Sequence, residues 1–436
     1  MCERKMKIGL SMRGLGYHQA SWRKPNVPAL GSLDLQYKIE IARIAERAKF
    51  DLIFFADGLG IRTKDIPVGA NSHSHENVEF EPLTLLSALS QHTKHIGLIC
   101  TASTTYNDPF NLARRFASLD HLSGGRAGWN VVASWSDEEA KNFGKGTPLD
   151  YPTRYERATE FLDVVNGLWQ SWESDAFVLD KASGQFYDPS KLNVLNHSGK
   201  YFAVRGPLTV SPSPQGKPII VQAGASEEGT DLAASRSDVV YAASDNVESL
   251  KKFYAIIKSK AEAFGRDPAK VVVMPALSTF VGESRSEAED KLAEIDSLID
   301  PLVGLSRIAR FMGDLSGYSV DTLVEDIQLE ANAGLQSFRD SMVAMSKRDK
   351  LTIRQLYTRL AGGLSLRLVG TAKDIADEME SLFAGGAADG FNLTPAVLPT
   401  TVEDFATLVV PELQRRGLFR EEYESDTLRG NLGLAG

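Results

Sequence analysis

The fold is decided by residues 95–134, HIGLICTASTTYNDPFNLARRFASLDHLSGGRAGWNVVAS. The two apolar runs at its ends, residues 95–104 and 125–134, are typical of parallel strands that are covered on both faces. Between them, residues 109–123 predict a helix, and Pro109 suits its first turn. A strand, a helix and a second strand form a right-handed crossover. This stretch therefore predicts one βαβ unit of a parallel sheet.

The same alternation continues on both sides of this unit. Apolar runs predict strands at residues 6–12, 50–57, 95–104, 125–134, 217–226, 237–243, 269–282 and 389–397. Helical spacing of apolar residues follows these runs, as in residues 34–49. About eight strands, each followed by a helix, predict an α/β fold of the TIM (β/α)8 barrel type. A doubly wound open sheet is the alternative, but neither G-x-G-x-x-G nor G-x-x-x-x-G-K-[ST] occurs in the chain.

The chain has 436 residues, whereas a TIM barrel typically takes about 250. We expect the additional length in long insertions at the C-terminal face of the barrel, at residues 58–80, 175–217 and 301–365. Residues 175–217 are rich in Gly, Pro, Ser and Asn, and residues 301–365 contain helical patches that glycines interrupt. We therefore expect a single barrel domain over residues 1–436.

Composition disfavours several classes of protein. Lys and Arg number 48 against 57 Asp and Glu, a net charge of −9, whereas nucleic-acid binding and polybasic membrane attachment use a basic surface. Two cysteines, Cys2 and Cys100, are too few for a disulfide framework. No apolar run reaches 18 residues, and no secretory segment precedes the first strand. We therefore expect a cytoplasmic protein that contacts neither nucleic acid nor membrane.

Polar side chains gather at the predicted strand ends, where a barrel of this type carries its chemistry. They are His18, Asp57, Thr101, Asn130, Gln222, Ser226 and Asn392. This set holds one carboxylate among neutral hydrogen-bonding groups, so it lacks the paired acids of a glycosidase. It suits the binding of a large planar heterocycle with amide edges and hydroxyls more than it suits hydrolysis.

A second group of residues points to a phosphate. Residues 224–226, Gly-Ala-Ser, lie between a predicted strand and a helix, where free N–H groups and the helix dipole favour an anion. Ser226 can add a hydroxyl, or it serves only as the helix N-cap. Tyr151 and Tyr155 start the helix after the fourth strand and can donate phenol hydrogen bonds to a phosphate or a ribityl chain.

The histidines suggest two further roles. His73 and His75 form the H-x-H pair of metal-dependent barrel hydrolases, but they fall in a polar loop well past the second strand. We therefore predict no metal site. His18 follows the first strand, close to Trp22, and it is either a packing residue or a general acid or base with a pKa near neutrality. We take it as the candidate catalytic residue.

Several segments resemble the bacterial-luciferase-like flavin monooxygenases. They are GYHQASWRKP, FFADGL, TASTTYNDPFNLARRFASLDHLSGGRAGWNVVAS, YPTRYERATEF, IIVQAGAS and DGFNL. More narrowly, they are similar to the branch of the nitrilotriacetate, pristinamycin and dibenzothiophene-sulfone monooxygenases. The similarity covers most of the chain, and LDHLSGGRAGWNVV is its specific block. Family members often have Thr where this chain has Ala133.

The resemblance implies a TIM-barrel enzyme that uses reduced FMN (FMNH2) and O2 to oxygenate a small organic substrate. It implies a separate NAD(P)H-dependent flavin reductase as partner, and a homodimer or homotetramer. A deazaflavin-dependent oxidoreductase on the same barrel and a non-catalytic flavin-binding protein remain alternatives.

The resemblance also implies which residues contact FMN. They are Asp57, Thr101, Tyr151, Tyr155 and Ser226, with Asn130 as a further neighbour. The chemistry of the side chains agrees: Thr101 and Asn130 would bond the isoalloxazine edge, and Asp57 would accept from a flavin N–H or a ribityl hydroxyl. The phosphate would lie by the two tyrosines and Ser226.

Overall fold

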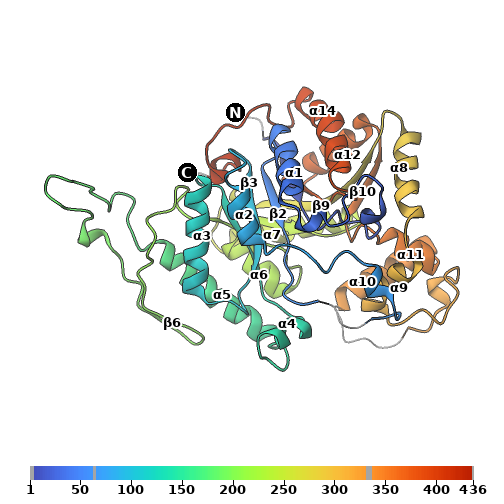
Figure 1. The fold of residues 1–436 in the computed structure, drawn as a ribbon, viewed down its shortest axis with the longest axis horizontal. Helices are drawn as coiled ribbons and strands as arrows, with labels where there is room; N and C mark the ends of the chain where they lie inside the picture. The colour runs from blue at the N-terminus through green and yellow to red at the C-terminus, as the bar shows by residue number, and fades with distance from the viewer. Residues whose placement is uncertain (1–3, 62–64, 330–335, 435–436) are drawn as a thin grey trace.

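The structure is a computed structural model that describes residues 4–61, 65–329 and 336–434 (Figure 1). Within these residues, eight parallel strands form a closed barrel. In their order around the barrel, the strands are β1 (Lys7–Ser11), β2 (Leu52–Phe55), β3 (Gly97–Ser103), β4 (Ala127–Val132), β7 (Ile219–Gln222), β8 (Val239–Ala242), β9 (Val272–Val281) and β11 (Gly390–Leu393). The predicted TIM barrel is confirmed, and the open sheet is excluded because β11 pairs with both β9 and β1.

Helices pack around the outside of the barrel. They include α1 (Leu35–Arg47), α2 (Pro82–Leu89), α3 (Pro109–Ser123), α5 (Tyr151–Trp169), α6 (Glu227–Arg236), α7 (Val247–Ala263), α8 (Arg285–Ser297), α12 (Ala372–Ala384), α13 (Thr400–Asp404) and α14 (Val410–Arg415). Their starts follow from local sequence: the Asp34 and Asp108 carboxylates accept from first-turn N–H groups, and Pro109 takes the first position of α3. Among the described residues, no helix combines the length and the apolar composition that a membrane span requires.

The lower half of the barrel interior is closed by apolar packing. Inward-facing side chains of the strands form a buried cluster with Leu428, Leu432 and Leu434, which lie in and after the short helix α15 (Leu428–Asn431). A Cβ at Gly97, the first residue of β3, would come within 2.5 Å of the Leu428 side chain, so only glycine leaves room for this plug. Because side chains fill the barrel at the strand starts, we expect a ligand to bind at the strand ends.

Two of the expected insertions lie at the C-terminal face. Residues 58–80 follow β2 and contain a 3-10 turn, Ala70–His73, that packs on α9 (Pro301–Met312). The described parts of residues 301–365 form α9, α10 (Gln336–Asp349) and α11 (Ile353–Arg359), which share a small apolar core of their own.

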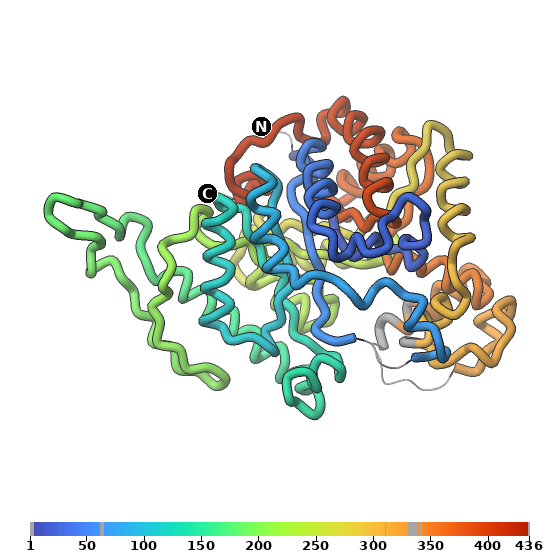
Figure 2. Tube along the Cα trace, viewed as in Figure 1, coloured from blue at the N-terminus to red at the C-terminus, as the bar shows by residue number. Residues whose placement is uncertain are grey.

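The third insertion lies elsewhere, and the prediction that it belongs to the C-terminal face was wrong. Residues 175–217 connect the end of α5 to the start of β7, and they form an arm that extends away from the barrel (Figure 2). At the base of this arm, Ser213 donates to Asp120, which also accepts from the N–H of Ala127 at the start of β4. A helix-to-strand connection therefore lies at the opposite rim, because parallel strands all start there.

One strand was not predicted. β10 (Leu366–Gly370) pairs only with the second half of β9, from Leu277 to Val281, outside the closed barrel. β9 reaches this far because it has ten residues, whereas β11 pairs with it only at Ala276 and Leu277. The extra strand ties α9–α11 to the rim of the barrel mouth.

Candidate active site

Thr101 and Asn130 meet inside the barrel mouth, as predicted from their strand positions. They are direct partners in the register of β3 and β4, and the Asn130 Nδ2 donates to the Thr101 Oγ1 at 2.8 Å. Only 4% of Asn130 is exposed, and its Oδ1 has no hydrogen-bond partner among the described residues. Buried amide oxygens in native structures are nearly always paired. This one is therefore available to an N–H or O–H group of a ligand.

Two further buried polar atoms share this property. The Asn392 Oδ1 on β11 and the Tyr241 hydroxyl on β8 are buried and have no partner among the described residues. Asn392 faces inward, because a Cβ built on its register partner Gly9 would lie 3.0 Å from its Oδ1. Together with Asn130, these atoms form the polar floor of the mouth, which fits a ligand that presents hydrogen-bonding groups along one edge.

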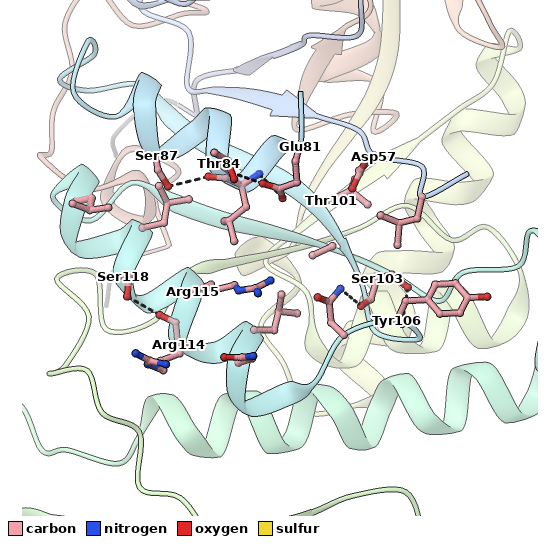
Figure 3. A pocket seen from close by; sticks show the side chains of 18 of the residues that line it. Asp57, Glu81, Thr84, Ser87, Thr101, Ser103, Tyr106, Arg114, Arg115 and Ser118 are labelled. Carbon is pink, nitrogen blue, oxygen red and sulfur yellow. Dashed lines mark hydrogen bonds between the residues drawn. The ribbon is translucent and has the colours of Figure 1, made fainter. Parts of the chain in front are cut away.

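Asp57 lies beside Thr101 at one end of a groove of about 720 Å³ that continues between α2 and α3 (Figure 3). Figure 3 shows Ser118 and Arg114 toward the other end. Burial raises the pKa of Asp57 to about 6, the carboxylates of Glu81 and its neighbours add to this rise, and the Gly58 N–H opposes it. Near neutral pH, Asp57 is therefore the one group of this predicted set that readily gains or loses a proton.

Tyr151, Tyr155 and Ser226 come together although two separate helices carry them. The tyrosine ring centroids lie 5.1 Å apart, and the side chains of both Tyr151 and Ser226 influence the pKa of the Tyr155 hydroxyl, so the three groups lie close together. Burial raises the pKa of Tyr155 to about 12, so its phenol remains a donor. The Ser226 Oγ also accepts from the Gly229 N–H at 3.0 Å, which makes Ser226 an N-cap as well as a candidate ligand.

The sequence interpretation missed Arg154, which lies next to this cluster. Its guanidinium lies 5.1 Å from the centre of the Tyr151 ring, and its Nη1 donates to the Ser134 carbonyl at 3.2 Å. Its buried Nε has no hydrogen-bond partner among the described residues. The segment YPTRY carried the signal, since an arginine between two phenols at a helix start complements a phosphate in charge and in donors.

His18 lies apart from these residues. Only 1% of it is exposed, its Nδ1 accepts from the Ala20 N–H at 3.2 Å, and its Nε2 lies 3.0 Å from the Asp296 Oδ1. The backbone donor fixes the ring proton on Nε2, which therefore donates to Asp296 on α8. Burial lowers the pKa of His18, and Asp296 opposes this shift. Both ring nitrogens are engaged within the protein, and His18 does not line the groove beside Asp57.

The H-x-H pair is divided between two partners. The His73 Nδ1 lies 2.7 Å from the Asp300 Oδ2, whereas the His75 Nε2 lies 3.1 Å from the Ser21 Oγ. Within the part of the chain that the structure describes, no three His, Cys, Asp or Glu side chains are grouped to hold a metal ion.

Comparison with known proteins identifies the family. The sequence model of the luciferase-like monooxygenases matches residues 15–389. The chain belongs to this family. It is 46% identical to N-acetyl-S-(2-succino)cysteine monooxygenase of Bacillus subtilis over 99% of the chain and 97% of that protein. It is 43% identical to nitrilotriacetate monooxygenase component A of Aminobacter aminovorans, with the same two shares.

A solved structure agrees with this assignment. DmoA from Hyphomicrobium sulfonivorans superposes with a TM-score of 0.90 at 34% identity, over 99% of this chain and 92% of that one. The predicted resemblance is confirmed, and so is the narrower branch with the nitrilotriacetate, dibenzothiophene-sulfone and pristinamycin enzymes. The chain is thus a member of the luciferase-like monooxygenases over most of its length.

Proposed function

We propose that this luciferase-like protein is the oxygenase of a two-component system, which takes FMNH2 from a separate NAD(P)H-dependent flavin reductase and oxygenates a small organic substrate with O2. The observation that carries the proposal is the clustering of Tyr151, Tyr155 and Ser226, whose rings and hydroxyls two separate helices bring together. Family membership supports the flavin, and the unpartnered Asn130 Oδ1 supports a ligand that carries its own donors.

The side chains fit FMN at both ends. Tyr151, Tyr155, Ser226 and Arg154 would bind the phosphate, since they offer three hydroxyls and a cation. Thr101 and Asn130 would hold the ring edge, and Asp57 would accept from a flavin N–H or a ribityl hydroxyl. When bound, FMNH2 supplies the reaction with O2. The polar floor would orient the ring, and the apolar packing of Leu428 and its neighbours at the strand starts would keep bulk water from that side.

His18 has a different proposed part. Its ring joins the loop after β1 to Asp296 on α8. We propose that it positions this loop at the mouth, and that a general acid or base role would require release from Asp296.

Family membership also supports an assembly of several copies. We propose a cytoplasmic homodimer or homotetramer in which residues 1–436 of each copy form one domain. The exposed side chains of Leu122 and Phe143, which line the groove along α2 and α3, support contact between copies. The pairing of β1 with β11 supports a single domain, because it joins the two ends of the chain.

A coupled assay tests this function. The purified chain is supplied with NADH, FMN, O2 and a substrate panel that includes nitrilotriacetate and N-acetyl-S-(2-succino)cysteine, with and without an unrelated flavin reductase. We expect almost no product without the reductase and turnover with it, because no dinucleotide fingerprint is present for NADH. Substantial turnover driven by NADH alone would refute the two-component proposal. Product formation without O2 would refute oxygenation itself.

A further inference from the structure

A small cavity lies across the barrel mouth from the Tyr151–Tyr155–Ser226 cluster. It has a volume of about 30 Å³ and is enclosed by the loop after β1, the loop after β2 and α9. Its polar lining includes Gln19, Ser74, Glu76, Asn77, Ser306 and Arg307. A volume of this size has room for a group of a few atoms.

Gln19 is the unusual residue of this cavity. Only 4% of it is exposed, and neither its Nε2 nor its Oε1 has a hydrogen-bond partner among the described residues. Its backbone N–H donates to the Ala361 carbonyl at 3.0 Å, so the main chain at Gln19 is held in place. A buried amide without partners destabilises the free protein, because its donors and its acceptor have lost their bonds to water.

The charged groups of the cavity are already paired. The Arg307 Nη1 lies 3.0 Å from the Glu76 Oε1, and the Arg13 Nη2 lies 3.5 Å from the Glu76 Oε2. An ionic ligand would have to compete with this arrangement. The unmet groups belong instead to a neutral amide, which needs an acceptor for its N–H and a donor for its C=O at the same time.

The cavity also adjoins the barrel mouth. A Cβ at Gly363 would lie 3.7 Å from Arg307 and 4.0 Å from Tyr17, so these two side chains are neighbours. The Tyr17 hydroxyl in turn bonds to Ser11, the last residue of β1. If one group of a ligand binds at Gln19, the rest of that ligand would therefore lie beside the strand ends.

We propose that this cavity binds a primary carboxamide group (–CO–NH2) of the substrate, with the Gln19 Nε2 donating to its carbonyl oxygen and the Gln19 Oε1 accepting from its N–H. In a primary amide these two groups lie on one edge, so a single glutamine side chain can bond both. Ser74, Asn77 and Ser306 supply the remaining polar contacts. This inference rests on the proposed function, since it assigns a substrate class to the same mouth.

Two isosteric probes test the cavity without any flavin. Succinamate carries the primary amide, and 4-oxopentanoate has the same length, carbonyl and carboxylate with CH3 in place of NH2. We expect isothermal titration calorimetry on the flavin-free protein to give at least tenfold tighter binding of succinamate. A site built to bond a group rejects the analogue that lacks it. Gln19→Met should abolish this preference, and Gln36→Met, on the exposed face of α1, should keep it.

Equal binding of the two probes, or an unchanged preference in Gln19→Met, would overturn the proposal and leave the cavity as a site for structural water. If Gln19→Met does not fold, Gln19→Glu serves instead, because its carboxylate keeps the shape, removes the donors and repels the ligand carbonyl. The two proposals fail separately. Reductase-dependent product formation without any amide preference would overturn this inference alone, whereas amide preference without product formation would overturn the proposed function.

Discussion

The two sides of the barrel mouth carry different chemistry. On the side of α5 and α6, Thr101, Asn130, Tyr155 and Ser226 are neutral hydrogen-bonding groups at strand ends and helix starts. On the side of α9, the long loops bring charges together, with Glu76 paired to two arginines. Lys38 is buried below this network, where it donates to the Gly14 carbonyl at 2.6 Å, and burial lowers its pKa to about 8.

This difference suggests that one side of the mouth binds the ligand and the other side stabilises the loops. Neutral groups on strands and helix caps are fixed by the barrel itself, so they can be ready for a ligand without stabilising the fold. The ion pairs on the other side hold loops that the barrel does not fix, so their main contribution is to the stability of the mouth. Substitutions on the first side should therefore change binding, and substitutions on the second should change stability.

The largest effect is expected at Glu76. Only 11% of its side chain is exposed, and replacing it with alanine leaves the Arg13 and Arg307 guanidiniums without their shared partner. Removing one member of a largely buried ion pair costs about 3 kcal/mol or more. We expect Glu76→Ala to lower the free energy of unfolding in urea by about 3 kcal/mol. FMN affinity should stay near that of the wild type.

Glu76→Gln is the matched control, because it keeps the size and one acceptor while it removes the charge. Its loss should lie between wild type and Glu76→Ala. A loss in Glu76→Ala below about 1 kcal/mol, the value of an exposed ion pair, would show that the network does not hold the mouth.

The opposite result is expected at Ser226. Aspartate is as good an N-cap as serine, so Ser226→Asp should leave the free energy of unfolding nearly unchanged. Its carboxylate would repel the FMN phosphate beside Tyr155, and we expect the dissociation constant from flavin fluorescence titration to rise about tenfold to a hundredfold. Ser226→Asn, a neutral cap of similar size, should bind FMN much more tightly than Ser226→Asp. Unchanged affinity in Ser226→Asp would place the phosphate elsewhere.

The two sides of the mouth also differ in how well the sequence predicted them. Thr101 and Asn130 could be placed together because strand register is local and parallel strands end at one rim. Ser226 could be placed because Gly-Ala-Ser marks a strand-to-helix junction. Such signals depend on only a few neighbouring residues, and the barrel fold then determines where these residues lie in space.

The charged side gave no such signal. Glu76 and Arg307 are 231 residues apart, and His18 and Asp296 are 278 apart. No periodicity links positions so distant in loops and in a separate helical core. The candidate role of His18 therefore rested on its place after a strand, whereas its actual environment depends on α8. Arg154 differs from these distant pairs, because its sequence neighbours Tyr151 and Tyr155 were already predicted as ligands.

The smallest effect is expected at Asp57, the one carboxylate among the predicted ligands of the neutral side. Its pKa rises from 3.8 to about 6 in the folded protein because burial disfavours the charged form. A carboxyl with a raised folded-state pKa binds its proton more tightly when folded, so its contribution to stability is present below pH 3.8 and is lost as the pH rises through about 6. Two pKa units correspond to about 2.7 kcal/mol, and solvent screening at a partly exposed group reduces this to about 1 kcal/mol.

Asp57→Asn removes this titration and keeps the shape, so it isolates the effect. We expect the wild type to lose about 1 kcal/mol more than Asp57→Asn between pH 4 and pH 7 in urea unfolding, after other titrations cancel in the difference. FMN affinity of the wild type should change over the same interval, because the ionised carboxylate accepts a hydrogen bond from the ligand more strongly than the protonated carboxyl does, and affinity of the variant should not. Parallel pH profiles for the two proteins would mean that Asp57 is solvated like a surface carboxylate, and the neutral side would then contain no group that responds to protons near pH 6.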